Sequence, residues 1–60
     1  MITIQCQLEE NEAIQVTKFF NRVTYNDIYI QEFNEIECYQ ILYAIEKLRT
    51  ALFQQGVFIS

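Results

Sequence analysis

Histidine and proline are absent from this 60-residue sequence, glycine occurs once, and cysteine occurs twice, at Cys6 and Cys38. Two thiols without a histidine do not supply the four nitrogen or sulfur ligands of a structural zinc site. They also allow one disulfide at most. Because disordered linkers are polar and rich in proline and glycine, we expect an ordered structure along nearly the whole chain.

A chain of this length forms at most one domain, which we assign to residues 1–60. Such a domain buries only about 60% of the surface that its unfolded chain exposes. Small domains therefore usually need a disulfide network, a metal or oligomerisation. The sequence offers neither of the first two, and 52% of its residues are apolar. Tight packing or self-association must supply the stability.

The formal net charge is −4, from eight acidic and four basic residues. An acidic chain is a poor partner for nucleic-acid backbones and anionic membranes, and it suits a basic patch on another protein. The longest apolar run, residues 41–45, is far shorter than the roughly 20 residues of a transmembrane helix. The N-terminal stretch MITIQCQLEE lacks the regions of a signal peptide, so we expect a cytoplasmic location.

Apolar and polar residues alternate in three segments, which predicts three β-strands. The first segment is residues 1–8, and the polar, acidic residues 9–12 follow it as a turn. Residues 13–20 alternate again and predict an antiparallel hairpin with the first segment. A tight turn at residues 26–27, Asn-Asp, then leads to a third strand at residues 28–33.

The longest patterned stretch predicts a helix that begins after Asn34 and ends at Gly56. Asn34 is placed to cap the helix, and Glu37 occupies the third helical position, which gives a reciprocal capping pair. Glycine is a common helix stop. The last four residues, VFIS, predict a short fourth strand. The expected fold class is therefore α+β, with a three-stranded antiparallel β-meander, one long helix across it and a short final strand.

Two sides of this helix carry apolar residues when successive positions are placed 100° apart. One broad arc, which we expect to cover the sheet, comprises Cys38, Ile41, Leu42, Ile45, Leu48, Leu52 and Phe53. Ile36, Tyr39 and Tyr43 lie roughly opposite, and we call these three residues the back face. Tyrosine is enriched at protein interfaces. The back face therefore predicts an intermolecular contact. The alternative is that the C-terminal strand or residues 21–27 of the same chain cover it.

The simplest intermolecular contact is a homodimer, because a two-fold, self-complementary interface is the commonest form of association. We expect it to use the back face, the C-terminal strand, or both. The C-terminal strand would contribute Val57, Phe58 and Ile59.

No group of side chains indicates catalysis. Glu32, Glu35 and Glu37 lie near the predicted helix start, where capping and the helix dipole account for them. The sequence has no histidine, and its only serine is Ser60. A core this small hardly supplies a walled active-site pocket. We therefore predict no enzymatic activity, no cofactor and no metal.

Cys6 and Cys38 have three candidate roles with chemistry: a nucleophile, a redox pair or a disulfide. Each thiol lies on the apolar side of its predicted element, so both are most simply small, buried and reduced hydrophobic residues. Whether they touch each other stays open at this point.

Nucleic-acid binding is an alternative function. Tyr25, Tyr29 and Phe33 could form a sheet that stacks bases, but such platforms normally lie in a basic field, and this chain is acidic. Aromatic pairs between strands are the simpler explanation. The acidic residues could also imitate a phosphate track. The densest group, Glu9, Glu10 and Glu12, is more simply a solvated turn or a surface for a basic partner.

The leading prediction is a non-enzymatic protein-binding module that binds itself and another protein. Motif-free, acidic chains of this length are typical of the small accessory proteins of phages and mobile elements, so an inhibitor or regulator of a larger bacterial protein is the expected role. The first alternative is a self-assembling structural or accessory subunit. The second is a nucleic-acid-binding or nucleic-acid-mimicking protein.

Overall fold

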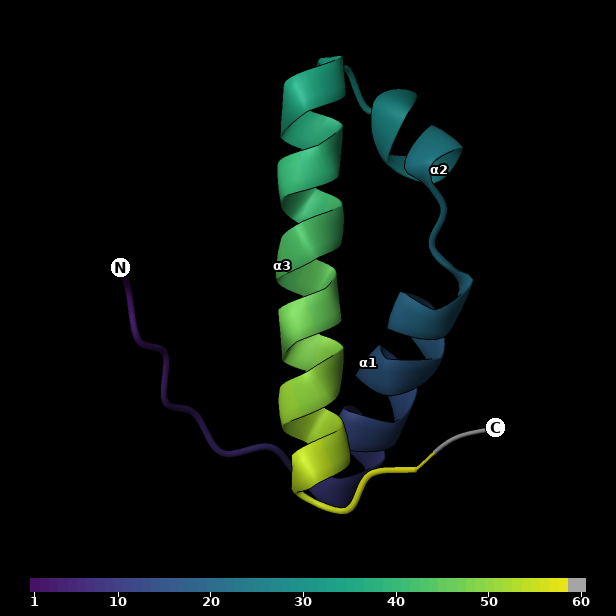
Figure 1. Cartoon of the computed structure of the whole chain (residues 1–60). Coiled ribbons are helices and arrows are strands. Elements are labelled where there is room, and N and C mark those ends of the chain that lie inside the picture. Colours follow the sequence, from purple (N-terminus) through teal and green to yellow (C-terminus); the bar gives the residue numbers. More distant parts are fainter. Residues whose placement is uncertain (59–60) are drawn as a thin grey trace.

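The computed structural model describes residues 1–58 and shows three helices joined by short connections (Figure 1). Helix α1 spans Glu10–Arg22, α2 spans Tyr25–Tyr29 and α3 spans Glu35–Gln54. Helix α3 runs the length of the molecule. Helix α2 lies beside its N-terminal half and α1 beside its C-terminal half, and both contact it.

The predicted α+β fold is wrong, because residues 1–58 contain helices and no strand. Residues 13–20, predicted as the second strand, lie within α1. Residues 28–33, predicted as the third, hold the end of α2 and the turn after it. The first segment, residues 1–8, has no strand partner in the described part of the chain. Val57 and Phe58 form no strand, and Ile59 lies outside the described residues.

Helix α1 forms because its apolar residues satisfy a helical period as well as an alternating one. Ala13 and Thr17 are four residues apart, and both are buried. The Thr17 hydroxyl donates a hydrogen bond to the Ala13 carbonyl at 2.7 Å, so this β-branched residue fits the helix interior. The predicted acidic turn instead starts the helix. The Glu9 N–H donates to the Glu12 carboxylate at 2.8 Å, which satisfies an otherwise unpaired donor.

Helix α2 replaces the tight turn expected at residues 26–27. Thr24 caps it: the Thr24 hydroxyl accepts a hydrogen bond from the Asp27 N–H at 3.3 Å, and the Thr24 N–H donates to the Asp27 carboxylate at 2.9 Å. This reciprocal pair was present in the sequence as Thr-x-x-Asp and was missed there. Glu32, with φ of 71°, reverses the chain direction after the helix.

The predicted ends of α3 are confirmed. The Asn34 side-chain oxygen accepts a hydrogen bond from the Glu37 N–H at 2.8 Å, and the Glu37 carboxylate accepts one from the Asn34 N–H at 2.9 Å. At the other end, Gly56 has φ of 89°, where glycine is favoured. The Gly56 and Val57 N–H groups donate to the carbonyls of the last helical turn, which is the Schellman arrangement.

The core is a narrow stripe between α3 and the two shorter helices. Its buried residues are Ala13, Thr17, Ile28 and Cys38, of which Cys38 is fully buried. Ile41, Leu42, Ile45 and Leu52 are half-buried along α3. Leu48 and Phe53 were also expected inside, but both are exposed. Phe53 instead contacts Phe58 edge to face, with ring centroids 4.8 Å apart. Two short helices cover a narrower arc of α3 than the expected sheet would have covered.

The cap of α3 gives a first testable prediction. Replacing Asn34 with alanine should lower the free energy of unfolding by about 0.5–2 kcal/mol, because it leaves the Glu37 N–H without its partner. Asn11→Ala, at an exposed position in the first turn of α1, is the matched control and should have little effect. Urea unfolding followed by circular dichroism measures both. Equal effects of the two substitutions would contradict the assigned cap.

The attachment of α2 gives a second prediction. Ile28 and Ile30 are two isoleucines two positions apart in the sequence. Ile28 is 4% exposed, whereas Ile30 is 68% exposed. Ile28→Ala should cost about 2–5 kcal/mol, as for other buried truncations. Ile30→Ala should stay within about 0.5 kcal/mol of the parent. The same unfolding experiment measures the pair, and a reversed order would mean that α2 packs on α3 through its other side.

Candidate interaction surface

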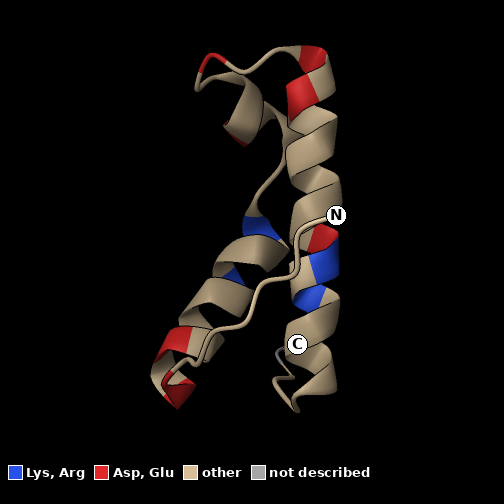
Figure 2. Ribbon diagram, turned by 90° about the vertical axis from the view of Figure 1, so that its left-hand side faces the viewer, with Lys and Arg blue, Asp and Glu red and all other residues tan. Residues whose placement is uncertain are grey.

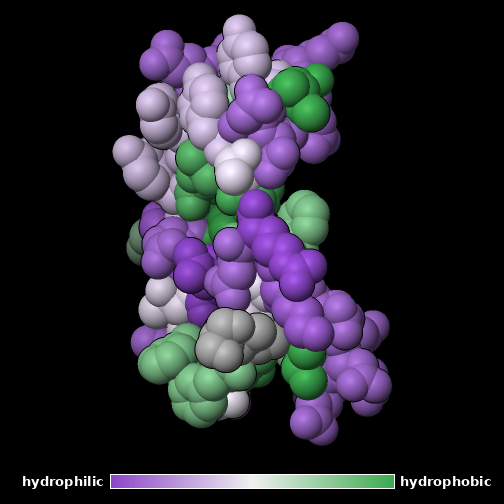
Figure 3. All heavy atoms as spheres, turned by 90° about the vertical axis from the view of Figure 1, so that its right-hand side faces the viewer, coloured by the Kyte–Doolittle hydropathy of each residue, from purple (hydrophilic) through white to green (hydrophobic). Residues whose placement is uncertain are grey.

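The chain exposes far more surface than a folded monomer of its size. Its accessible surface is 5481 Å², about 1,400 Å² above the roughly 4,100 Å² expected for this mass. Its radius of gyration is 12.5 Å, against about 10 Å for a compact chain of this length. Apolar side chains contribute to this surface: Figure 3 shows hydrophobic residues at the surface between α2 and α1 and at the lower end of the molecule.

The back face of α3 belongs to this exposed surface. Ile36 is 71% exposed, Tyr43 is 65% exposed, and Tyr39 is exposed to a smaller extent. Residues 21–27 and the C-terminal turn leave Ile36 and Tyr43 largely exposed, but the Tyr25 ring contacts Tyr39. Within the described part of the chain, the intramolecular alternative therefore holds for Tyr39 alone. The use of the back face as an interface stays a prediction.

Three tyrosines meet at the junction of α2 and α3. The Tyr25 and Tyr29 rings stack with centroids 5.9 Å apart and an interplanar angle of 15°. The Tyr25 ring also contacts Tyr39, with centroids 5.3 Å apart. Tyr25 and Tyr29 lie one turn apart on helix α2. They do not form the base-stacking sheet that the nucleic-acid alternative required. The contact between Tyr25 and Tyr39 joins α2 to α3 and places one end of the back face beside an aromatic cluster.

An open hollow of about 700 Å³ adjoins this tyrosine cluster. Its lining combines aromatic rings with carboxylates and comprises Tyr25, Tyr29, Glu32, Phe33, Asn34 and Glu35. Aromatic faces and carboxylates both attract cations. The hollow is thus suited to a lysine or arginine side chain of a partner.

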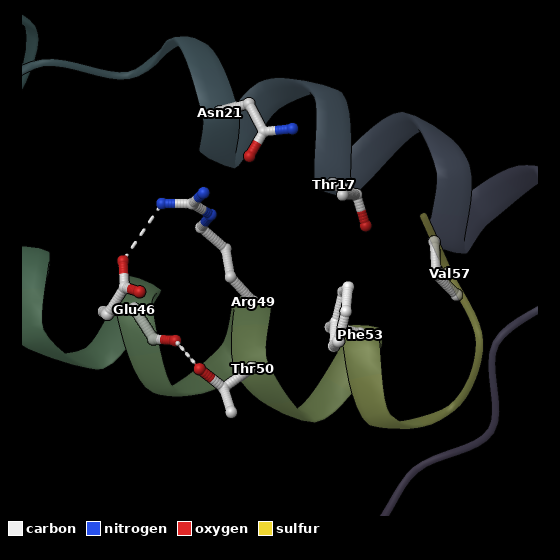
Figure 4. A pocket seen from close by; sticks show the side chains of 7 residues that line it. All are labelled: Thr17, Asn21, Glu46, Arg49, Thr50, Phe53 and Val57. Atoms are coloured by element: carbon white, nitrogen blue, oxygen red, sulfur yellow. Dashed lines mark hydrogen bonds and ion pairs between the residues drawn. The ribbon is translucent and has the colours of Figure 1, made fainter. Parts of the chain in front are cut away.

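A second hollow, of about 250 Å³, lies between α1 and α3 (Figure 4). Arg49 reaches toward α1 there, while its guanidinium is paired with the Glu46 carboxylate at 3.0 Å. The Thr50 hydroxyl donates to the Glu46 carbonyl at 3.0 Å. Among the described residues, every buried side-chain nitrogen or oxygen has a hydrogen-bond partner. Glu46 thus binds both Arg49, through its carboxylate, and Thr50, through its carbonyl.

Charge is segregated along the molecule. Figure 2 shows most acidic residues at the two ends of the molecule and the basic residues between them, in the C-terminal halves of α1 and α3. Glu46 lies beside the basic residues of α3 and pairs with Arg49. The start of α1 carries Glu9, Glu10 and Glu12. All three are exposed, and the positive end of the helix dipole stabilises their negative charges. The ends of the molecule therefore present negative surfaces to a basic partner.

The two cysteines lie in opposite environments. Cys38 is fully buried, and its thiol is 3.8 Å from the Phe33 carbonyl oxygen. Cys6 is exposed, so the prediction that it is buried is wrong for the single chain. Both are free cysteines, and they form no disulfide.

Residues 1–58 contain neither a metal-binding cluster nor a membrane-spanning helix. No cluster of three or more acidic or cysteine side chains in this range could hold a metal ion. None of its helices combines the length and apolarity needed to cross a bilayer.

Comparison with known proteins gives one match. Residues 1–58 match a family described as "Family of unknown function (DUF7706)". No curated protein and no solved structure matches the chain.

The tyrosine cluster gives a third prediction. The partial burial of the Tyr25 ring raises the pKa of its phenol above 10.0, and repulsion from Cys38 and Glu35 adds to the increase. Subtracting the tyrosinate absorbance of Tyr25→Phe from that of the parent isolates the signal of Tyr25. The titration midpoint of this signal should lie above pH 10.0. Glu35→Gln should lower that midpoint, and Glu10→Gln, far from the cluster, should not.

Because this pKa is raised in the folded state, the associated stability is fully present below the unfolded-state pKa. It is lost as the pH rises through the folded-state pKa of Tyr25. A difference titration at or below the ordinary tyrosine value would contradict the described surroundings of the ring.

Proposed function

We propose that this chain, which belongs to the family of unknown function DUF7706, is a non-enzymatic protein-binding module. The observation that carries the proposal is the exposure of large apolar side chains on a chain whose total accessible surface exceeds that expected for its mass. A standard protein interface buries about 800 Å² on each partner, and the excess of total surface here is larger. Exposed apolar patches are typical of interaction sites.

The back face is the proposed binding surface. Its aromatic and aliphatic side chains are of the type that dominates interface energetics, and they project from a helix whose opposite side holds the core. Tyr39 and Tyr43 can bury their rings while their hydroxyls remain at the solvated rim. Because Asn34 and Gly56 fix both ends of α3, the surface is rigid before binding, which lowers the entropic cost of association.

The charge distribution favours a basic protein partner. One acidic end of the molecule is the start of α1. The other is the α2–α3 junction, where the hollow lined by Tyr29 and Glu35 also lies. Electrostatic complementarity of this kind speeds encounter and selects partners more than it adds affinity. A small acidic module that occupies a basic surface of a larger bacterial protein would act as its inhibitor or regulator. The two unpaired thiols fit a reducing, cytoplasmic setting.

The second candidate is a subunit that binds only its own copies. The large radius of gyration and the small core favour it, because both are typical of chains whose core is completed by association. Nucleic-acid binding has weaker support, since the net charge is negative and the tyrosines form no sheet.

The back face gives a fourth prediction. In the double variant Ile36→Ser/Tyr43→Asp, any contact made through this face should weaken at least about tenfold, equivalent to about 1.4 kcal/mol. The control is Gln40→Ser/Ala44→Asp, which makes the same charge change at exposed positions elsewhere on α3. Sedimentation at several protein concentrations measures self-association. Affinity capture from a bacterial host, compared between the two variants, measures binding of other proteins.

A protein that is captured by the parent and by the control, but lost by the double variant, would support the module. If the parent binds neither itself nor any protein through this face, or if both double variants behave alike, the back face is not a binding surface.

A further inference from the structure

Residues 2–8 are the least covered part of the chain. They run as an elongated coil on the side of α3 that faces away from α2 (Figures 1 and 2). Ile2 is 91% exposed and Ile4 is 73% exposed, and Cys6 and Leu8 are exposed as well. Within residues 1–58, no residue of this segment donates or accepts a hydrogen bond. The segment thus leaves apolar side chains and backbone groups without partners.

The composition of this segment favours pairing with another strand. Its even positions are apolar, and its odd positions are the uncharged polar residues Thr3, Gln5 and Gln7. In an extended chain the two sets lie on opposite faces. Proteins protect exposed strand edges with charges, prolines or bulges, and residues 2–8 contain no charged residue, proline or glycine.

We propose that residues 2–8 pair with the same residues of a second copy, as an antiparallel two-stranded ribbon about a two-fold axis. In the single chain, the regular elements within residues 1–58 are all helices. The ribbon exists only in the complex. Centring the pair on Gln5 engages the whole segment: Gln5 lies opposite the partner's Gln5, and Thr3 lies opposite the partner's Gln7. All apolar side chains of both strands then share one face.

A second copy fits this segment because self-pairing satisfies both chains equally. The contact is self-complementary, as a two-fold interface requires. Two uncharged segments approach without repulsion, whereas the acidic starts of α1 repel each other and favour the distant ends of the pair. The excess of exposed area, about 1,400 Å² per chain, is larger than the roughly 800 Å² that each partner buries in a standard interface and lies in the range of permanent homodimers.

The ribbon also needs a surface beneath it, because two strands alone are only marginally stable in water. The long helices expose apolar side chains that can serve, among them Phe19 of α1 and Leu48 of α3. Packing of the ribbon's apolar face on such side chains would extend the narrow core of each chain. The ribbon forms without the back face and without any foreign partner.

Two neighbouring substitutions test the ribbon. Ile4→Lys places a charge on its apolar face, and Gln5→Lys places the same charge on its polar face. Both lie outside the helices, so circular dichroism should show that the chain still folds. In sedimentation over a range of concentrations, Ile4→Lys should weaken the dimer at least about tenfold more than Gln5→Lys does.

The native thiols report the same contact without substitution. Cys6 should react quickly with an alkylating reagent in dilute protein and slowly in concentrated protein, because the ribbon covers it. Cys38 should stay unreactive at both concentrations, since it is buried within each chain.

Cross-linking tests the register. In a Cys6→Ser background, Gln5→Cys should form a disulfide-linked dimer on mild oxidation, because the two thiols lie opposite each other at the axis. Thr3→Cys in the same background should cross-link poorly, since it lies opposite the partner's Gln7.

A parent that stays monomeric at all concentrations would overturn the ribbon. So would a dimer that Ile4→Lys and Gln5→Lys affect equally, or one that leaves the labelling rate of Cys6 unchanged. If Ile4→Lys dissociates the dimer while Ile36→Ser/Tyr43→Asp does not, the ribbon stands and the back face is not the self-association surface. The reverse result would retain the back face and exclude the ribbon.

Discussion

Both shorter helices pack against one stripe of α3, and Cys38, the one fully buried side chain among the described residues, lies at the N-terminal end of that stripe. Ala13, Thr17 and Ile28 are the other buried residues between the helices. Because the stripe is so narrow, most of the circumference of α3 stays exposed, including the back face. The same constraint leaves Leu48 and Phe53 in solvent, although they follow the apolar period of the helix. The single chain thus folds around α3 and leaves its apolar surface incompletely buried.

Local hydrogen bonds define where each helix begins. Glu9, Thr24 and Asn34 each donate their N–H to an acidic side chain three residues later. Such caps depend on neighbours in the sequence and not on a large core. This explains how a chain with few buried side chains still has three well-defined helix starts. The caps fix the helices, whereas the thin core limits how firmly the helices hold one another.

The sequence allowed α3 to be predicted from Asn34, Glu37 and Gly56, because capping and stop motifs are local. The same logic applied to Thr24 and Asp27 would have located α2. Residues 13–20 were misassigned since apolar positions there fit both a period of two and a helical period, and β-branched residues weighted the choice toward a strand. The back face was predictable from periodicity alone. A partner for this face could not be predicted in the same way, because surface complementarity also depends on the partner's own surface.

The two proposed contacts differ in what they allow the assembly to do. A chain with two self-complementary contacts closes into a dimer only if both share one two-fold axis; otherwise the contacts alternate and build an open chain. If the ribbon of residues 2–8 makes the dimer, the back faces of the two copies remain available to other proteins. Two identical binding surfaces on one rigid particle then engage a repeated or dimeric target with an avidity above that of either surface alone. A ribbon dimer would therefore convert the small acidic module into a bivalent one, with the negative ends of each chain left free to select a basic partner.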